Sequence, residues 1–298
     1  MNLGNLSPEH QERLKYLFEK GEAQKAKEEM ERRQNAGKSN PIIQPVNPSV
    51  NPSVNPSVNP SVNPSVNPFI NPPSPAQGLT NPQDYIILEG KVHGKYNYAD
   101  TLVAMNRTHQ GKNWNDSHKA CADEGGYMLG IRQFVDFLNL IKSGNAFDGK
   151  GRKISSSKLE GIYDDITKVA GDWRSEWLDA DFKVLNGKVV MNYEHRMKNG
   201  ILTPNRPNEI LEGYLDEGKQ PGISLDDWLT RATYQGLPPV DVKEDKSKAG
   251  LWYWQPGKDN NSVARFVACI VKTSLICSKG PLSKYSYLGV RAVREKMN

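Results

Sequence analysis

The sequence predicts a mixed α+β domain over residues 84–298, preceded by a short helical segment and a linker. Three observations predict this class. Apolar residues recur at helical spacing in three stretches between residues 114 and 169. Runs of strand-forming residues flank Asn186-Gly187, a dipeptide typical of tight hairpins. After Leu251 the chain is rich in turns and has no helical period, so we expect helices and short strands to share one domain.

Composition and charge exclude several classes of protein. Hydrophobic residues make up 37% of the 298 residues, and nearly all core-forming residues follow Gln83. That part of the chain is long enough to bury one core of ordinary size. The formal net charge is +5, with both signs spread along the chain and no dense basic block that contains aromatic residues. We therefore expect no nucleic-acid partner.

Cysteine usage and the lack of targeting segments predict a reducing compartment. Cys121, Cys269 and Cys277 are an odd and sparse set, unlike a secreted disulfide framework. No apolar run is long enough to span a bilayer, and residues 1–10 lack the basic and apolar parts of a signal peptide. We expect a cytoplasmic location and no membrane span. Loading into a virion or display on a cell surface would leave no mark on this sequence.

Residues 1–38 predict a helical segment or hairpin. Pro8 follows Ser7, which is the pattern of a first helical residue after an N-cap. Gly21 is expected to end this helix, and a second, mostly charged helix is expected over 22–33. The apolar stripe of the first helix comprises Leu14, Leu17 and Phe18. The pair has too little apolar surface to stand alone, so it is either a handle for a docking partner or a solvated tail.

Residues 39–83 predict a disordered linker. The unit Val-Asn-Pro-Ser repeats in tandem over 46–65. Each proline lacks an N–H and moves the preceding asparagine out of the helical region, so neither a helix nor a sheet can form. Fully extended, such a spacer separates its ends by about 100 Å. It acts either as a stalk for a binding head or as a repeat expansion that nothing selects against.

The order of elements in the domain follows from apolar spacing and turn signals. Gly125-Gly126 supplies a helix stop, and Asn186-Gly187 supplies a hairpin turn. The expected helices cover 114–123, 131–141 and 158–169. The expected strands cover 85–88, 101–105, 182–185, 188–193 and a closing strand at 288–293. The tryptophans expected in the core are Trp173, Trp177, Trp228, Trp252 and Trp254.

Two stretches resemble the C-type lectin fold. The stretch from Trp114 through Ser117 to Cys121, followed by Gly125-Gly126 and Leu129, resembles the first-helix signature of that fold. The closing Gly-Val-Arg-Ala-Val-Arg of 289–294 resembles the last strand of its formylglycine-generating-enzyme branch. The resemblance implies a C-type lectin-like domain over roughly 84–294.

Two further stretches, 173–182 and 259–266, resemble segments of the variable proteins of diversity-generating retroelements from archaea and their viruses. In that family an error-prone reverse transcriptase rewrites adenines in a template repeat, and the copy replaces the 3′ end of the target gene. The resemblance implies a display protein without enzyme activity or cofactor. It also implies that the region 259–294 binds a protein or other macromolecular ligand that differs between variants.

Residue types in this region fit such variation in part. An Asn codon with both adenines randomised yields Cys, Ile, Val, Ser, Leu or Tyr but never Lys, so Lys272, Lys279 and Lys284 depart from the pattern. The predicted variable, ligand-binding positions are Val267, Cys269, Ile270, Val271, Lys272, Ser274, Ile276, Ser278, Leu282, Lys284, Tyr285 and Tyr287. The predicted pocket floor is Trp252 or Trp254. The alternative is an ordinary strand-loop-strand, although clustered exposed apolar residues often mark a contact surface.

Other constellations favour structural roles. The Trp-Asn-Asp tripeptide at 114–116 is similar to a calcium-site tripeptide of sugar-binding lectins, but here it opens a helix, and no Glu-Pro-Asn or Gln-Pro-Asp occurs. Cys269 and Cys277 resemble the copper-binding pair of formylglycine-generating enzymes, but the residues around them do not complete that active site. Buried or incidental thiols are the favoured interpretation.

The histidines and acids near the centre of the chain also favour structural roles. His195 follows Glu194 on a strand, where adjacent residues face opposite ways and form no acid–base pair. His118 is expected to be a satisfied, half-buried histidine. Asp179 and Asp181 share one face and are expected to accept hydrogen bonds rather than hold a cation. We therefore predict no metal site. The alternative functions are a formylglycine-generating-type oxidase and a viral or cell-surface adhesin of fixed specificity.

Overall fold

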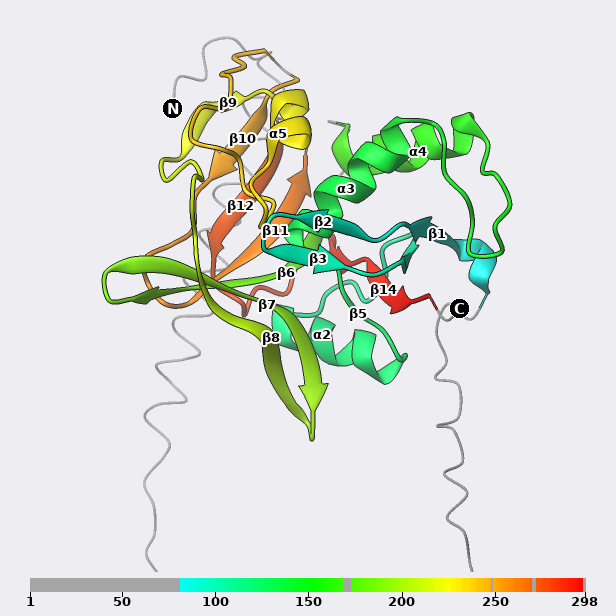
Figure 1. Ribbon diagram of the computed structural model, residues 1–298, viewed down its shortest axis with the longest axis horizontal. Helices are drawn as coiled ribbons and strands as arrows, with labels where there is room; N and C mark the ends of the chain where they lie inside the picture. Colours follow the sequence, from blue (N-terminus) through cyan, green and yellow to red (C-terminus); the bar gives the residue numbers. More distant parts are fainter. Residues whose placement is uncertain (1–80, 169–172, 248, 270–271, 297–298) are drawn as a thin grey trace, which may run out of the picture. The chain divides into compact units, whose positions relative to one another are not determined.

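An eight-stranded sheet organises the part of the chain that the structure describes. The structure is a computed structural model and describes residues 81–168, 173–247, 249–269 and 272–296 (Figure 1). The strand order is β8-β7-β6-β11-β12-β10-β9, and β13 also pairs with β6. The strands are β6 (Arg174–Leu185), β7 (Lys188–Lys198), β8 (Ile201–Ile210), β9 (Lys219–Ile223), β10 (Leu251–Trp254), β11 (Ser262–Ala268), β12 (Thr273–Lys279) and β13 (Leu288–Val290). The pairs β10–β12 and β13–β6 are parallel.

A second, four-stranded sheet has the order β1-β4-β14-β5. Its strands are β1 (Tyr85–Leu88), β4 (Thr101–Ala104), β5 (Tyr127–Met128) and β14 (Ala292–Glu295), and a separate hairpin comprises β2 (Lys91–His93) and β3 (Tyr96–Tyr98). Only Arg291 separates β13 from β14, so the chain passes from one sheet to the other there. Arg291 is 1% exposed, and its Nη2 lies 2.6 Å from Glu176 Oε1. Its Nη1 donates to the carbonyl of Ala104 at 2.9 Å.

Helices α2 (Trp114–Asp123), α3 (Ile131–Lys142), α4 (Ser156–Thr167) and α5 (Leu225–Arg231) pack against these sheets, and a short 3-10 turn, η1 (Pro82–Asp84), precedes β1. Side-chain caps explain three of the helix starts. Asn113, Ser155 and Ser224 accept hydrogen bonds from backbone N–H groups of the first turns of α2, α4 and α5. Gly125 has a φ of +71°, which only glycine adopts readily, and the chain turns away from α2 there. In sequence colours, α3 and α4 are the green helices of Figure 1.

The core lies between α3 and the large sheet. Phe134 of α3 is fully buried, and its ring centroid is 4.9 Å from that of Phe266 in β11. The Trp228 ring of α5 stacks on Phe266, with centroids 6.2 Å apart. A second apolar cluster contains Trp114 and Trp177 and lies nearer to α2. Burial of these aromatic side chains supplies much of the driving force for folding.

Local signals in the sequence predicted many of these elements. The helix over 114–123 is confirmed, and α3 ends one residue beyond its predicted end. Helix α4 begins two residues before its prediction because Ser155 caps it. The hairpin at Asn186-Gly187 is confirmed, with φ of 50° and 74° at those residues.

Three predictions were wrong. The closing strand over 288–293 is two strands in different sheets, because the buried Arg291–Glu176 pair fixes a crossing between them. Trp254, expected in the core, is 39% exposed, and Trp173 and Trp252 are only partly buried. Strands β6 and β7 extend well beyond the predicted runs, because the first part of β6 pairs with β11 and β13 and β7 continues into a second hairpin with β8.

The helical segment over 1–38 and almost all of the linker over 39–83 lie outside the described residues. Every described residue falls within one compact unit, Phe69–Asn298. None of the helices in the described ranges combines the length and the apolar run that a membrane crossing requires.

Candidate functional site

One face of the large sheet brings together many of the predicted ligand-binding residues. Residues that lie opposite each other on neighbouring strands point to the same side of a sheet. The paired positions are Trp252 with Ser274, Trp254 with Ile276, Ile276 with Arg265, and Ser274 with Val267. We call the side of the sheet that carries these six residues the outer face. The register of β10, β11 and β12 explains how residues 22 positions apart become neighbours.

The alternate residues of the same strands form the inner face, which packs into the core. The inner face comprises Tyr253, Phe266, Leu275 and Cys277, all 0–1% exposed and all members of the main apolar cluster. Val267 and Ile276 of the outer face are 3% and 8% exposed, yet they belong to neither apolar cluster of the described residues. The two faces therefore differ in what they contact more than in how far they are buried.

The predicted ligand-binding residues divide by exposure. The buried ones are Val267, Cys269, Lys272, Ser274 and Ile276. Ser278 and Tyr287 are half-buried, whereas Leu282, Lys284 and Tyr285 are exposed. Ile270 and Val271 lie outside the described residues. The part that a ligand can reach directly is therefore the 282–287 segment, and the ligand-binding role of the buried positions stays a prediction.

An aromatic group lies in and beside this segment. The rings of Tyr285 and Tyr287 stack with centroids 5.1 Å apart and planes within 5° of parallel. The ring of Trp173 lies 5.5 Å from that of Tyr287. Tyr285 is 37% exposed and Leu282 is 72% exposed. Rings of this kind offer a large contact area at a small cost in side-chain entropy, as they do in antibody loops.

Arg265 lies beside this aromatic group without a counter-ion among the described residues. Its Cζ is 5.9 Å from the centroid of the Tyr285 ring, and the side chain is buried. Neither Nε nor Nη1 has a hydrogen-bond partner, and burial lowers the pKa of the guanidinium. Burial also raises the pKa of Tyr287 to about 12, so that phenol is neutral at pH 7 and offers Arg265 no opposite charge. A buried, unpaired cation is unfavourable unless a partner supplies an anion.

A surface hollow of about 640 Å³ adjoins the ends of β10 and β12. Trp254 and Ser278 line it together with Gln220 and Lys258. Trp254, one of the two predicted pocket-floor residues, lines this hollow, and its role under a ligand stays a prediction. Trp252 is half-buried and does not belong to the lining.

The two cysteines that resembled a copper-binding pair do not come together. The backbone N–H of Cys269 donates to the carbonyl of Lys272 at 3.3 Å, so Cys269 lies beside the start of β12. Cys277 is five residues further along the same strand, which is about 17 Å at the usual rise of a strand. Its side chain lies on the inner face, where burial raises the pKa of the thiol.

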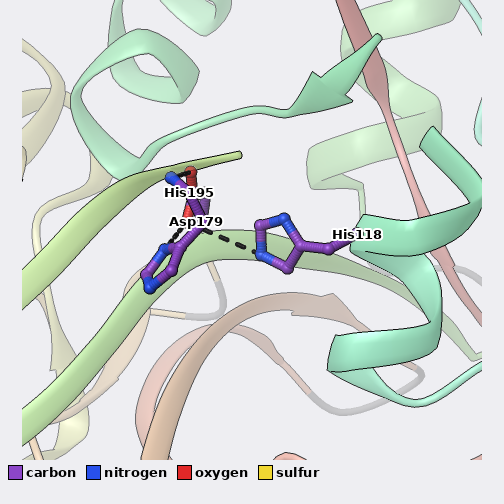
Figure 2. A group of neighbouring side chains, drawn as sticks. All are labelled: His118, Asp179 and His195. Atoms are coloured by element: carbon purple, nitrogen blue, oxygen red, sulfur yellow. Dashed lines mark hydrogen bonds and ion pairs between the residues drawn. The ribbon is translucent and has the colours of Figure 1, made fainter. Parts of the chain in front are cut away.

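A separate polar cluster is buried between α2 and the β6–β7 hairpin. Figure 2 shows its members: His118 from α2, Asp179 from β6 and His195 from β7. His195 Nδ1 is 2.5 Å from Asp179 Oδ1, and the backbone N of His195 donates to Asp179 Oδ2 at 2.8 Å. His118 Nε2 is 3.6 Å from Asp179 Oδ1. The expectation that Asp179 accepts hydrogen bonds is confirmed. Its carboxylate lies beside the imidazoles of both His195 and His118.

The expectation of a satisfied, half-buried His118 was wrong. The side chain is 2% exposed, and Nε2 has no hydrogen-bond partner among the described residues. Such an unpartnered buried group costs about 1–3 kcal/mol. Burial lowers the pKa of His118 to about 4, although Asp179 opposes the shift, so the imidazole is neutral at pH 7. The ring of Trp114 meets it edge-on at 4.3 Å, because both residues lie on the side of α2 that faces the hairpin.

Two further features border the cluster. His195 Nε2 lies 3.8 Å from Asp181 Oδ1, and that oxygen is buried without a hydrogen-bond partner. A cavity of about 330 Å³ includes Asp179, Glu194 and Arg196 in its lining. Burial raises the pKa of Glu194. Sequence reasoning missed this cluster because its members are separated by up to 77 positions along the chain, and only the packing of α2 on β7 joins them.

Comparison of the chain with known protein families, curated proteins and solved structures finds no match.

Proposed function

We propose that this chain is a ligand-binding display protein whose C-terminal surface is diversified by a retroelement reverse transcriptase. The observation that carries the proposal is the register of β10, β11 and β12. It places three of the predicted variable residues, Val267, Ser274 and Ile276, with the Trp252–Trp254 pair on the outer face, while Phe266, Leu275 and Cys277 alternate into the core. Diversification requires such a separation, because variable side chains must change without disturbing the packing beneath them.

We propose a C-type lectin-like fold of the formylglycine-generating-enzyme branch for the domain. Two features support it. The Trp114–Asp123 stretch forms helix α2 and turns at Gly125, as the resemblance implies. The closing stretch over 289–294 pairs with both sheets and brings the end of the domain beside its first strands.

The chemistry of the surface favours a macromolecular ligand that presents an acidic group next to an apolar one. Arg265 supplies a buried cation without a counter-ion, and Tyr285 and Tyr287 supply a flat aromatic area beside it. A carboxylate or phosphate that reaches Arg265 would gain a charge-assisted hydrogen bond in a site already shielded from water. The exposed Leu282 would contact the apolar part of the ligand.

The geometry disfavours one of the two alternative functions, the oxidase, and is compatible with the other, the adhesin. A copper-dependent oxidase needs its two cysteines within reach of one ion, whereas Cys269 and Cys277 are separated by about 17 Å along β12. An adhesin of fixed specificity would use the same outer face and the same aromatic group. It differs from the proposed function only in whether the gene carries directed variation.

The DNA beside the gene tests the proposal. We expect a near-copy of the codons for 259–294 close by. At the predicted variable positions the copy should carry adenines where the gene has other bases. At the inner-face codons the copy and the gene should be identical. At Lys272 and Lys284 we expect the template codon to differ from an Asn codon, since randomised Asn codons never yield Lys. If the flanking DNA holds no such copy, directed variation is excluded and an adhesin of fixed specificity takes its place.

A further inference from the structure

The cluster of His118, Asp179 and His195 has polar atoms that its own hydrogen bonds leave unsatisfied (Figure 2). Asp179 Oδ2 accepts a hydrogen bond from the backbone N–H of His195, and Asp179 Oδ1 is hydrogen-bonded to Nδ1 of the same histidine. The distance of 3.6 Å from Oδ1 to His118 Nε2 is longer than a hydrogen bond. His118 Nε2 is therefore aimed at the carboxylate from inside the protein and still has no partner. The three side chains are 1–5% exposed, so bulk water does not supply one.

The donor set of this cluster has a definite metal preference. Calcium and magnesium ions take oxygen ligands, whereas two imidazoles with one carboxylate suit zinc and similar first-row divalent ions. The three ligand atoms lie within 4.8 Å of one another. Ligand atoms around a tetrahedral zinc ion are about 3.3 Å apart. Shifts of about 1 Å in the side chains would therefore place all three atoms at bonding distance from one ion.

We propose that His118 Nε2, His195 Nδ1 and Asp179 Oδ1 bind a divalent transition-metal ion, with Zn²⁺ as the best match. This ion would join helix α2 to strands β6 and β7 at one point. It would also give the orphaned imidazole of His118 the partner that the protein lacks. The inference stands apart from the proposed ligand-binding role and depends on none of the outer-face residues.

A second unpartnered atom fits the same arrangement. Metal-bound histidines usually donate their other ring N–H to a carboxylate, which fixes the ring. Binding through Nδ1 would leave the Nε2–H of His195 directed toward Asp181 Oδ1, 3.8 Å away and without a partner of its own. One ion thus accounts for both buried orphans, at His118 and at Asp181. Asp181 would be a positioning residue for His195 rather than a ligand.

The cavity beside the cluster gives the ion a route of entry. Asp179 belongs to the lining of the cavity of about 330 Å³, together with polar groups of Gln133, Glu194 and Arg196. A zinc ion with three protein ligands usually completes its tetrahedron with water. This cavity is large enough to hold that water on the side of Asp179.

Metal binding by the full-length, untagged chain tests the proposal. The protein is treated with EDTA, moved into metal-free buffer and titrated with Zn²⁺, and bound zinc is measured by elemental analysis after gel filtration. We expect one zinc ion per chain and a higher midpoint of thermal unfolding. His118→Gln should weaken zinc binding about 100-fold or more, and Asp181→Asn about 10-fold. Asp179→Asn, which removes a ligand charge, should also weaken zinc binding, and if this variant does not fold, His118→Gln carries the test.

A matched control comes from another histidine–carboxylate pair in the same domain. His93 Nε2 lies 2.8 Å from Asp136 Oδ2, but Asp136 is also held by Arg132 and Tyr98, and within the described part of the chain no second imidazole joins this pair. His93→Gln should bind zinc as the unaltered chain does. Cobalt(II) in place of zinc should give visible absorption bands of nitrogen and oxygen ligation, without the near-ultraviolet bands of a thiolate.

Three results would each overturn the proposal. The first is an unaltered chain that takes up no zinc and shows no thermal shift, which would leave the cluster a hydrogen-bonded link between α2 and the hairpin. The second is a His118→Gln variant that binds zinc as tightly as the unaltered chain. The third is a cobalt spectrum with thiolate bands, which would place the ion at a cysteine instead.

Discussion

The outer and inner faces of strands β10, β11 and β12 share the same backbone but differ in their neighbours. Phe266 and Leu275 on the inner face belong to the main apolar cluster, and Phe266 packs against Phe134 of α3 and Trp228 of α5. Val267 and Ile276 on the outer face are nearly as buried, yet they join neither cluster. Burial alone therefore does not identify the residues that hold the fold together. The comparison teaches that two sides of one sheet can be buried to a similar degree while only one of them belongs to the main apolar cluster, which is the separation that the proposed function requires.

Phe266→Ala tests the inner face at its most central residue. The Phe266 ring contacts Phe134 and Trp228, so its removal leaves a cavity that neighbours cannot fill. We expect a loss of about 3–5 kcal/mol in the free energy of unfolding, measured by urea denaturation of the full chain. A loss below about 1 kcal/mol would mean that the inner face is not the structural one.

Leu275 and Ile276 are consecutive residues of β12 that lie on opposite faces of the sheet, so substituting each in turn compares the two faces at one place in the strand. Leu275→Ala should lower the free energy of unfolding by about 2–5 kcal/mol, as is usual for a core leucine. Ile276→Ala should lower it by only about 1–2 kcal/mol, since it removes buried area without opening the core. The same urea titration measures both variants. Equal losses would remove the distinction between the faces.

Arg265→Met sharpens the comparison on the outer face. The side chain is buried and unpaired among the described residues, so an apolar replacement of similar length should raise the free energy of unfolding by about 1 kcal/mol. Arg291→Met is the matched control and should destabilise the protein, because the buried Glu176 loses both hydrogen bonds from Arg291 and keeps only Arg107, whose Nε is 3.8 Å away. Marked destabilisation by Arg265→Met would show that Arg265 has a structural partner.

Tyr285→Ser should have the smallest effect on stability. Tyr285 is 37% exposed, stacks on Tyr287 and lies beside Arg265 without belonging to either apolar cluster of the described residues, so we expect a change within about 0.5 kcal/mol. Chemical denaturation with near-ultraviolet circular dichroism would report both stability and the environment of Tyr287. A change above about 2 kcal/mol would make the aromatic group part of the fold rather than a free surface.

Local signals were sufficient for the helices and one hairpin. Caps and stops that act within four residues fixed α2 and α4, and Asn186-Gly187 fixed the turn between β6 and β7. The same signal occurs at Asn199-Gly200, where both residues again have positive φ, and it would have found β8. Helix α5 likewise follows a Ser224 cap with two acidic residues in its first turn.

Long-range features could not be predicted from the sequence. The crossing at Arg291 depends on Glu176, 115 positions away, and the cluster around Asp179 depends on how α2 packs on β7. Strand β12 pairs in parallel with β10 and antiparallel with β11, and no local sequence signal specifies either pairing. Residue types predicted that 267–287 contains a surface, whereas exposure placed the accessible part of it at 282–287.

The most direct test of the central claim is to sequence the 3′ end of this gene deeply in its source population. The account predicts substitutions concentrated at the codons of outer-face positions such as Ser274 and Ile276 and of the exposed Leu282 and Tyr285. Codons of the inner face, Phe266, Leu275 and Cys277, should be unchanged. Variation spread evenly over both faces, or a uniform 3′ end, would contradict diversified binding by this surface.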